Sequence, residues 1–174
     1  MEAKEIDVND LLKEIDPISM MDTENYALLT AEKNGKANTM TVAWLQFGYL
    51  WNMPVATVYI RPQRYTKEFV DFAGRFSLTF FDYEENSKAL VYLGTNSGRD
   101  KPNKIEEAGL HLTYTDGLPT FEEGKIVVNC LVQYVQPITE EGFIYEEQNE
   151  AIYPDKDYSV MYVAKIESCY RIKE

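Results

Sequence analysis

A tight-turn signal between two apolar runs constrains the fold more than any other feature of this sequence. Asn34-Gly35 separates YALLTAE (26–32) from ANTMTVAWL (37–45), and this dipeptide between such runs is a strong signal for a β-hairpin. Further strand-like runs follow at PVATVYIR (54–61) and RFSLTFF (75–81). Because no regular strand–helix–strand alternation links these runs, we expect antiparallel pairing and a mainly β fold.

Helix-like patterns are short and lie between the strand-like runs. In TKEFVDFAG, Thr66 is a candidate N-cap and Gly74 a candidate stop. In ENSKALVYLG, the helix would close at Gly94. We expect peripheral helices at residues 3–15, 66–74 and 85–94, and from near Pro102 to Gly109.

The C-terminal third is again rich in strand-like runs. HLTYT (111–115), KIVVNCLVQYV (125–135) and YSVMYVAKIESCYRI (158–172) are typical of strands, and an acidic loop over 137–156 joins the last two. The whole pattern predicts an antiparallel β-barrel with short peripheral helices. At 174 residues the chain has the length of about one domain, which we expect to span 1–174.

The overall charge narrows the classes of partner. A formal net charge of −12 argues against nucleic acid and anionic membranes, which both require a cationic face. No apolar run approaches the length of a membrane span, and the N-terminal MEAKEIDVND is too acidic for a signal peptide. We therefore expect a cytoplasmic protein.

Side chains for direct acid–base or metal chemistry are scarce. The chain has one histidine, His111, and two cysteines, Cys130 and Cys169, with no zinc-type spacing. We expect no metal site, buried free thiols, and no catalytic residue that the sequence can name. If the protein is an enzyme, a cofactor supplies the reactivity, and the chain supplies binding and orientation.

The cationic side chains are concentrated in one part of this acidic chain. Residues 61–104 hold eight Lys or Arg against six Asp or Glu, a local net charge of +2, whereas the remaining residues have a net charge of −14. Such a block suits a small anionic ligand better than a polymer.

Within this block, the loop TNSGRDKPNK (95–104) is the first candidate anion site. Ser97-Gly98 offers a hydroxyl and approachable backbone amides, and Arg99 is a bidentate donor suited to phosphate. Asp100 is placed to orient Arg99 or to cap the following helix, and Lys104 adds charge. The alternative is a solvated polar loop, since the segment is not a P-loop.

Two further segments carry polar groups in suggestive places. RPQRYT (61–66) puts two arginines, a Tyr and a Thr between a strand and a helix, where phosphate groups often bind. In NTMTVAW (38–44), Asn38, Met40, Val42 and Trp44 would share one face of a strand. A half-buried strand with a core Trp is the alternative reading of this second segment.

The ordered set NTMTVAW, WNMP, RPQRYT, RFSLTFF, TNSGRD and YPDKDYSVMYVAKI resembles the flavin reductase-like family of FMN-binding split barrels, the group that includes flavoredoxin. The resemblance runs from about residue 25 to residue 170. It implies a six-stranded antiparallel Greek-key split barrel, a homodimer, and one FMN per subunit near the dimer interface.

The resemblance also implies the residues that would hold FMN. A strand segment would lie along the isoalloxazine, and two further segments would bind the ribityl-phosphate. These residues are Asn38, Thr39, Met40 and Thr41 for the ring; Arg61, Arg64, Tyr65 and Thr66 on one phosphate side; and Ser97, Gly98, Arg99 and Asp100 on the other, with Lys104 close by.

Three functions are compatible with these observations. The first is an oxidoreductase that transfers hydride from NAD(P)H to flavin. The second is an FMN-dependent electron carrier without direct NAD(P)H turnover, whose acidic surface would dock a redox protein partner. Ser159, where relatives usually have His, and Leu45, where they often have Gly, favour this second reading. The third is a non-enzymatic flavin-binding barrel.

Overall fold

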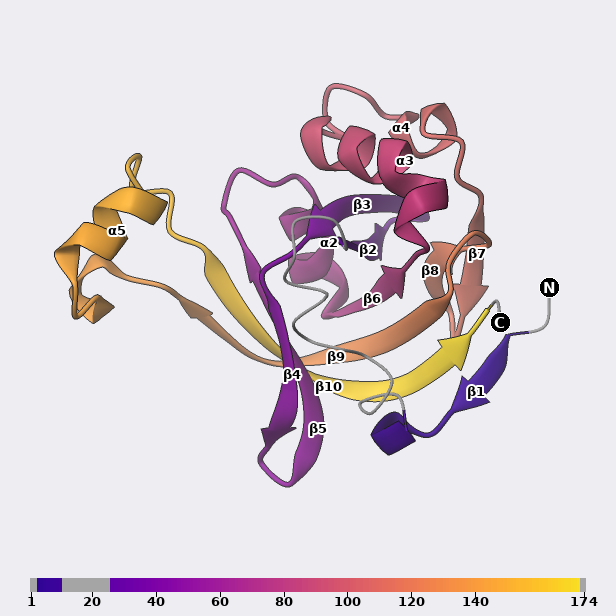
Figure 1. Cartoon of the computed structure of the whole chain (residues 1–174), viewed down its shortest axis with the longest axis horizontal. Helices are drawn as coiled ribbons and strands as arrows, with labels where there is room; N and C mark the ends of the chain where they lie inside the picture. Colours follow the sequence, from indigo (N-terminus) through magenta and orange to yellow (C-terminus); the bar gives the residue numbers. More distant parts are fainter. Residues whose placement is uncertain (1–2, 11–25, 173–174) are drawn as a thin grey trace.

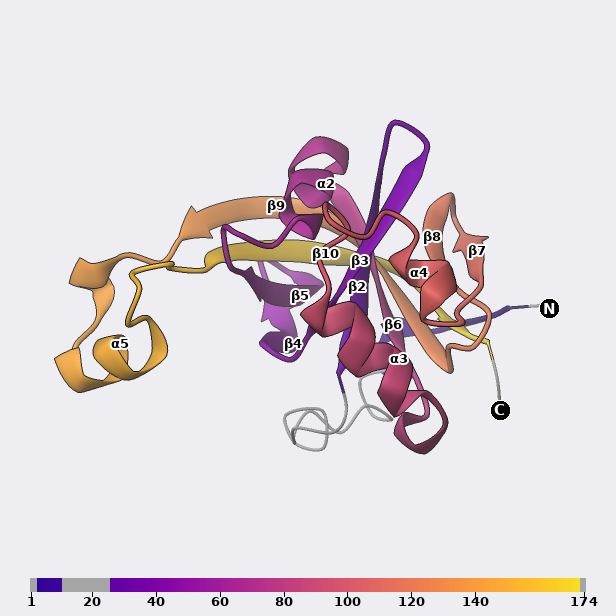
Figure 2. The same cartoon turned by 90° about the horizontal axis from the view of Figure 1, so that it is seen from above.

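The computed structural model describes residues 3–10 and 26–172, and the strands dominate this part of the chain (Figures 1 and 2). Its main sheet has eight antiparallel strands in the path β3-β2-β6-β9-β10-β5-β4, with β1 also paired to β10. A separate hairpin, β7-β8, lies off this sheet. The strands are β1 (Lys4–Ile6), β2 (Ala27–Lys33), β3 (Lys36–Val42), β4 (Leu45–Leu50), β5 (Met53–Ile60), β6 (Arg75–Phe80), β7 (Leu112–Thr115), β8 (Leu118–Phe121), β9 (Ile126–Pro137) and β10 (Val160–Arg171).

The sheet curls around one apolar core. Met40 of β3 and Val58 of β5 lie near opposite ends of the strand path, yet both belong to the same buried cluster. Phe69 and Val70 of α2 (Thr66–Ala73) pack into that cluster. The expected antiparallel, mainly β barrel with short peripheral helices is therefore confirmed. The main sheet of the described residues has eight strands, of which β1 and β4 were not indicated by the sequence pattern; the count of six came from the family resemblance.

The two-residue hairpins of the described residues use left-handed backbone, as Asp116 and Gly117 between β7 and β8 do with φ of 50° and 75°. In the predicted β2–β3 hairpin, Asn34 and Gly35 have φ values of 54° and 73°, as a type I′ turn requires. In the β4–β5 hairpin, Trp51 and Asn52 take the same region with φ of 52° and 59°. A tryptophan seldom adopts this conformation, so the sequence carried no turn signal there.

The expected helix over residues 3–15 is wrong at its start. Lys4–Ile6 forms β1, in register with Cys169–Arg171 of β10, because the backbone groups of that edge are available for pairing. Residues 8–10 are helical, and residues 11–15 lie outside the described part of the chain.

Helix α2 begins and ends almost as predicted. Gly74 is its C-cap in the left-handed region. The residue at the N-cap is Tyr65, with no side-chain capping bond, and Thr66 is the first helical residue. Thr66 is not free to cap because its Oγ accepts a hydrogen bond from Asn38 Nδ2 at 2.8 Å.

Helix α3 (Tyr83–Thr95) is longer than predicted. It begins after the N-cap Asp82, which accepts from the Glu84 amide, and it continues through Gly94 instead of stopping there. A Cβ at Gly94 would lie 2.2 Å from Thr41 Oγ1, so this glycine permits close approach of α3 to β3 rather than ending the helix. Helix α4 (Lys104–Glu107) is the short helix expected before Gly109.

A long excursion joins β9 to β10. Residues 138–159 contain a 3-10 turn, Glu140–Gly142, and helix α5 (Glu146–Ile152), where the sequence indicated only an acidic loop. Figures 1 and 2 both place α5 beyond the ends of β9 and β10, on the side away from α3 and α4. We call residues 138–159 the excursion.

Candidate functional site

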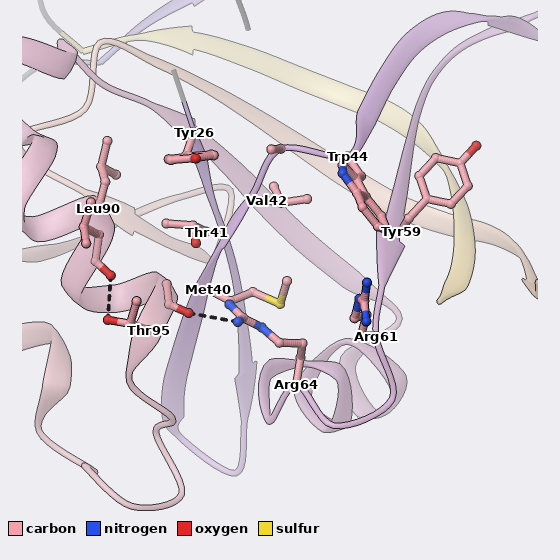
Figure 3. A pocket seen from close by; sticks show the side chains of 13 residues that line it. Tyr26, Met40, Thr41, Val42, Trp44, Tyr59, Arg61, Arg64, Leu90 and Thr95 are labelled. Atoms are coloured by element: carbon pink, nitrogen blue, oxygen red, sulfur yellow. Dashed lines mark hydrogen bonds between the residues drawn. The ribbon is translucent and has the colours of Figure 1, made fainter. Parts of the chain in front are cut away.

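A pocket of about 380 Å³ lies between β3, the last turns of α3 and the segment after β5. Its lining residues include Met40, Thr41 and Val42 from β3, Leu90 and Gly94 from α3, and Arg64. Figure 3 shows Arg64 extending toward α3 beside Met40, with Trp44, Tyr59 and Arg61 standing at the other end. Several of these side chains are apolar. We call this larger part of the site the ring pocket.

A smaller and more polar hollow of about 180 Å³ continues from the ring pocket. The two share Met40, Arg64, Gly94 and Thr95 among their lining residues, so they form one cleft. We call this second part the polar hollow. It is lined by the side chains or backbone of Asn38, Tyr65, Thr66, Ser97, Gly98 and Lys104.

Two cations line the polar hollow, and neither has a carboxylate partner in the part of the chain that the structure describes. Arg64 donates from Nη1 to the Gly94 carbonyl at 2.9 Å. The buried Lys104 donates from Nζ to the carbonyls of Leu93 and Asn96 at 3.1 and 2.9 Å. Within residues 3–10 and 26–172, no ion pair links either cation to an acidic side chain.

The electrostatics of these two residues reflect that lack of neutralisation. Burial, followed by the charge of Arg64, lowers the pKa of Lys104 to about 8. Burial also lowers the pKa of Arg64. Two groups that would gain from an arriving negative charge therefore line the polar hollow.

The loop 95–104 is held against β3 by close packing. A Cβ at Gly98 would lie 2.0 Å from Asn38 Oδ1, so a larger residue would displace the amide that donates to Thr66. Ser97 organises the turn, since its carbonyl accepts from the amide of Lys101 at 2.9 Å and its Oγ accepts from the amide of Arg99 at 3.2 Å. The loop 95–104, strand β3 and the start of helix α2 thus meet at the polar hollow.

Three of the implied residues lie elsewhere. Arg99 is exposed, pairs with Glu68 Oε1 at 2.5 Å and lies over the Tyr65 ring at 4.7 Å. Asp100 is also exposed and lines neither part of the cleft. Thr39 is buried on the opposite side of β3, where it donates to the Leu29 carbonyl.

Arg61 lines the ring pocket but is committed to the excursion. Its Nη1 lies 2.5 Å from Asp157 Oδ2, and its Nη2 donates to the Ile152 carbonyl at 2.8 Å. The guanidinium also lies over the rings of Trp44 and Tyr153, at 5.5 and 5.0 Å from their centroids. Its charge is therefore already satisfied, unlike that of Arg64.

Sequence reasoning missed several residues of the cleft. Tyr26, Tyr59 and Leu90 line the ring pocket, and no pattern singled them out. Gly94 could have been found, because a glycine inside a helical pattern often marks close packing. The structure places Leu45 in a neighbouring hollow and buries Ser159 completely outside the cleft.

The described residues show neither a metal cluster nor a membrane-spanning helix. Among residues 3–10 and 26–172, no group of three His, Cys, Asp or Glu side chains could hold a metal ion. In the same residues, no helix has the length and hydropathy that a transmembrane helix needs.

The donor set fits a phosphorylated planar ring. A phosphate monoester needs cations and hydroxyl donors, which Arg64, Lys104, Thr66 and Ser97 provide at the polar hollow. A flat ring system needs an apolar slot with a few polar groups at its edge, which the ring pocket provides. FMN combines these two parts in one molecule.

The chain is similar to several known proteins. An uncharacterized protein of Aeropyrum pernix is 33% identical over 135 residues, which cover 75% of this chain and 49% of that protein. The chain thus spans about half the length of that relative.

Two solved structures share the fold. An FMN-binding domain of a flavin reductases-like enzyme from Shewanella baltica has a TM-score of 0.68 at 18% identity, covering 98% of this chain and 77% of that one. Flavoredoxin from Methanosarcina acetivorans has a TM-score of 0.63 at 24% identity, covering 85% and 68%. Residues 23–170 match the family model described as the flavin reductase like domain. The chain belongs to the flavin reductase-like domain family.

Proposed function

We propose that this protein binds FMN in the cleft and acts as an oxidoreductase with NAD(P)H as the hydride donor. The observation that carries the proposal is the pair of cations, Arg64 and Lys104, without carboxylate partners in the described residues, at the narrow end of a cleft whose broad end is apolar. The Shewanella baltica neighbour, described as an FMN-binding domain of a flavin reductases-like enzyme, supports it.

The chain's own residues would bind and orient the cofactor. Arg64, Lys104, Thr66 and the Ser97-Gly98 turn would hold the phosphate in the polar hollow. Met40 and Thr41 would contact the ring, with Asn38 near its polar edge. When bound, FMN would supply the redox chemistry, because the cleft offers no histidine or cysteine to do so.

A visible absorption spectrum of the purified protein tests the proposal, recorded before and after anaerobic addition of NADH. We expect a flavin spectrum that bleaches promptly. A colourless protein that also fails to take up added FMN would overturn the cofactor assignment. Measuring riboflavin alongside FMN separates phosphate binding from ring binding.

The second candidate is an FMN-dependent electron carrier without direct NAD(P)H turnover. Ser159 favours it: the residue is fully buried, its Oγ has no hydrogen-bond partner among the described atoms, and it lines none of the pockets discussed. It is therefore not placed to move protons at the cleft. Bleaching by dithionite but not by NADH would favour the carrier.

We also propose that two copies of the chain associate. Tyr49, Leu50 and Trp51 are exposed on the β4–β5 hairpin, and Tyr134 and Val135 are exposed on β9. Trp51 and Tyr134 are neighbours, with ring centroids 6.0 Å apart, so these two exposed rings join the hairpin and β9 in one apolar surface. Light scattering after gel filtration is expected to give twice the chain mass; a monomer would contradict the proposal. A cytoplasmic location, a redox protein partner and a single domain over 1–174 remain predictions.

A further inference from the structure

A third hollow lies next to the ring pocket and is the largest of the three discussed, at about 770 Å³. It lies between the barrel residues Trp44, Gln46 and Tyr59 and the excursion residues Phe143, Gln148 and Tyr153. We call it the aromatic hollow. Its volume falls within the range of about 300–1,000 Å³ that is usual for small-molecule sites.

The walls of this hollow are held by aromatic contacts. Tyr153 meets Trp44 edge to face, with ring centroids 6.1 Å apart. It also contacts Phe143 at 6.0 Å and Tyr158 at 5.0 Å. Tyr153 is buried, so it forms a fixed wall to which a flat ring can pack.

Within the described part of the chain, the lining of this hollow carries no ionised group. Its lining residues include no Asp, Glu, Lys, Arg or His, and the polar ones besides tyrosine are the amides Gln46 and Gln148. The nearby Arg61 is neutralised by Asp157 and packed between Trp44 and Tyr153. An anionic ligand would lose its hydration here without gaining a free cation, whereas a neutral ligand would lose little.

The hollow also communicates with the ring pocket. Tyr26, Ala43, Trp44 and Tyr59 line both, and Figure 3 shows Trp44 and Tyr59 at the end of the ring pocket that faces away from Arg64's contact with α3. A ligand in the aromatic hollow would therefore lie beside whatever occupies the ring pocket, not in place of it.

We infer that the aromatic hollow is a second ligand site, which takes an uncharged, planar aromatic compound. A role for that compound as a redox partner of the flavin rests on the proposed function. Binding of the compound does not depend on the proposed function, because the walls of the hollow come from the barrel and the excursion of the same chain.

A matched pair of probes tests the inference: coumarin, which is neutral, and coumarin-3-carboxylate, which has the same rings and one negative charge. Isothermal titration of the full chain, with and without saturating FMN, measures both. We expect coumarin to bind at least about tenfold more tightly than the carboxylate, because only the carboxylate loses charge hydration. FMN should not displace coumarin.

Three variants locate the site, one of them a control. Tyr153→Ala removes a wall and is expected to weaken coumarin binding at least about fivefold, whereas Tyr145→Ala, an exposed aromatic on the same excursion, should not. Gln148→Lys puts a cation beside the hollow and should tighten binding of the carboxylate. A thermal melt checks the fold of each variant.

Equal binding of the two probes, displacement of coumarin by FMN, or unchanged binding in folded Tyr153→Ala would overturn the inference. Its failure is distinguishable from failure of the proposed function. If the protein binds coumarin but not FMN, the second site stands and the flavin assignment fails. If it binds FMN but not coumarin, the flavin assignment stands and the second site fails.

Discussion

Arg61 and Arg64 are three residues apart in one segment, yet they occupy opposite kinds of environment. Arg61 has a carboxylate at 2.5 Å, a carbonyl acceptor and two aromatic rings around it. Arg64 is partly buried, and within the described part of the chain its guanidinium donates to the carbonyl of Gly94 and pairs with no carboxylate. The difference shows that an arginine's role follows from what already neutralises it. Arg61 fastens the excursion to the barrel, and Arg64 is available for an anion.

The largest effect is expected at Arg64. Arg64→Met should weaken FMN binding by about 1.5–3 kcal/mol, the range for hydrogen bonds to a charged group. Riboflavin, which lacks the phosphate, should bind the variant and the wild type about equally. Fluorescence titration with both flavins measures this, with Arg64→Lys as the control that keeps the charge. An equal loss for riboflavin would show that Arg64 supports the cleft rather than the phosphate.

Lys104 adds a pH dependence to the same end of the cleft. Because its pKa is lowered to about 8, its charge is complete below that pH and is lost as the pH rises. FMN affinity should therefore fall by about tenfold between pH 7 and pH 9, and riboflavin affinity should stay flat over this range. Lys104→Met should abolish the pH dependence that distinguishes FMN from riboflavin; a flat FMN profile in the wild type would contradict the assignment.

Stability has the opposite dependence on pH at this residue. The folded protein binds the Lys104 proton more weakly than the unfolded chain, whose ordinary value is 10.5. The contribution of Lys104 therefore makes the FMN-free protein more stable as pH rises from about 8 toward the unfolded value. Comparing denaturant midpoints of the wild type and Lys104→Met over this range isolates that contribution.

A smaller effect, in a different observable, is expected at Arg61. Arg61→Leu breaks the contact with Asp157, whose pKa is lowered mainly by its hydrogen bond from Arg61. Local opening of the excursion should become modestly easier, since the pair is partly screened by solvent. Amide exchange over residues 152–159 measures it. FMN affinity should change much less than in Arg64→Met, and an equal loss would erase the distinction between the two arginines.

The smallest effect is expected at Arg99, although its loop was the first candidate anion site in the sequence. The side chain is 62% exposed and already paired with Glu68. Arg99→Ala should therefore weaken FMN binding by less than about 1 kcal/mol. A loss as large as that of Arg64→Met would show that Arg99 leaves Glu68 to bind the phosphate.

Much of the fold could be predicted because its signals are local. Asn34-Gly35 marks a type I′ turn and Gly74 ends a helix through their own backbone preferences. Lys4–Ile6 could not be recognised as a strand, because only the free edge of β10 makes it one. The Trp51-Asn52 turn was hidden for a related reason: the surrounding hairpin imposes a conformation that tryptophan seldom adopts.

The candidate site divides in the same way. The order of residues shows a concentration of positive charge over residues 61–104, which predicts an anionic ligand. The order of residues does not show which cations are free to bind a ligand. Arg61 and Arg99 are paired with Asp157 and Glu68, which lie 96 and 31 residues away along the chain. Local sequence sets backbone preference and charge supply, whereas the tertiary structure decides which charges are neutralised, since neutralisation depends on contacts between distant segments.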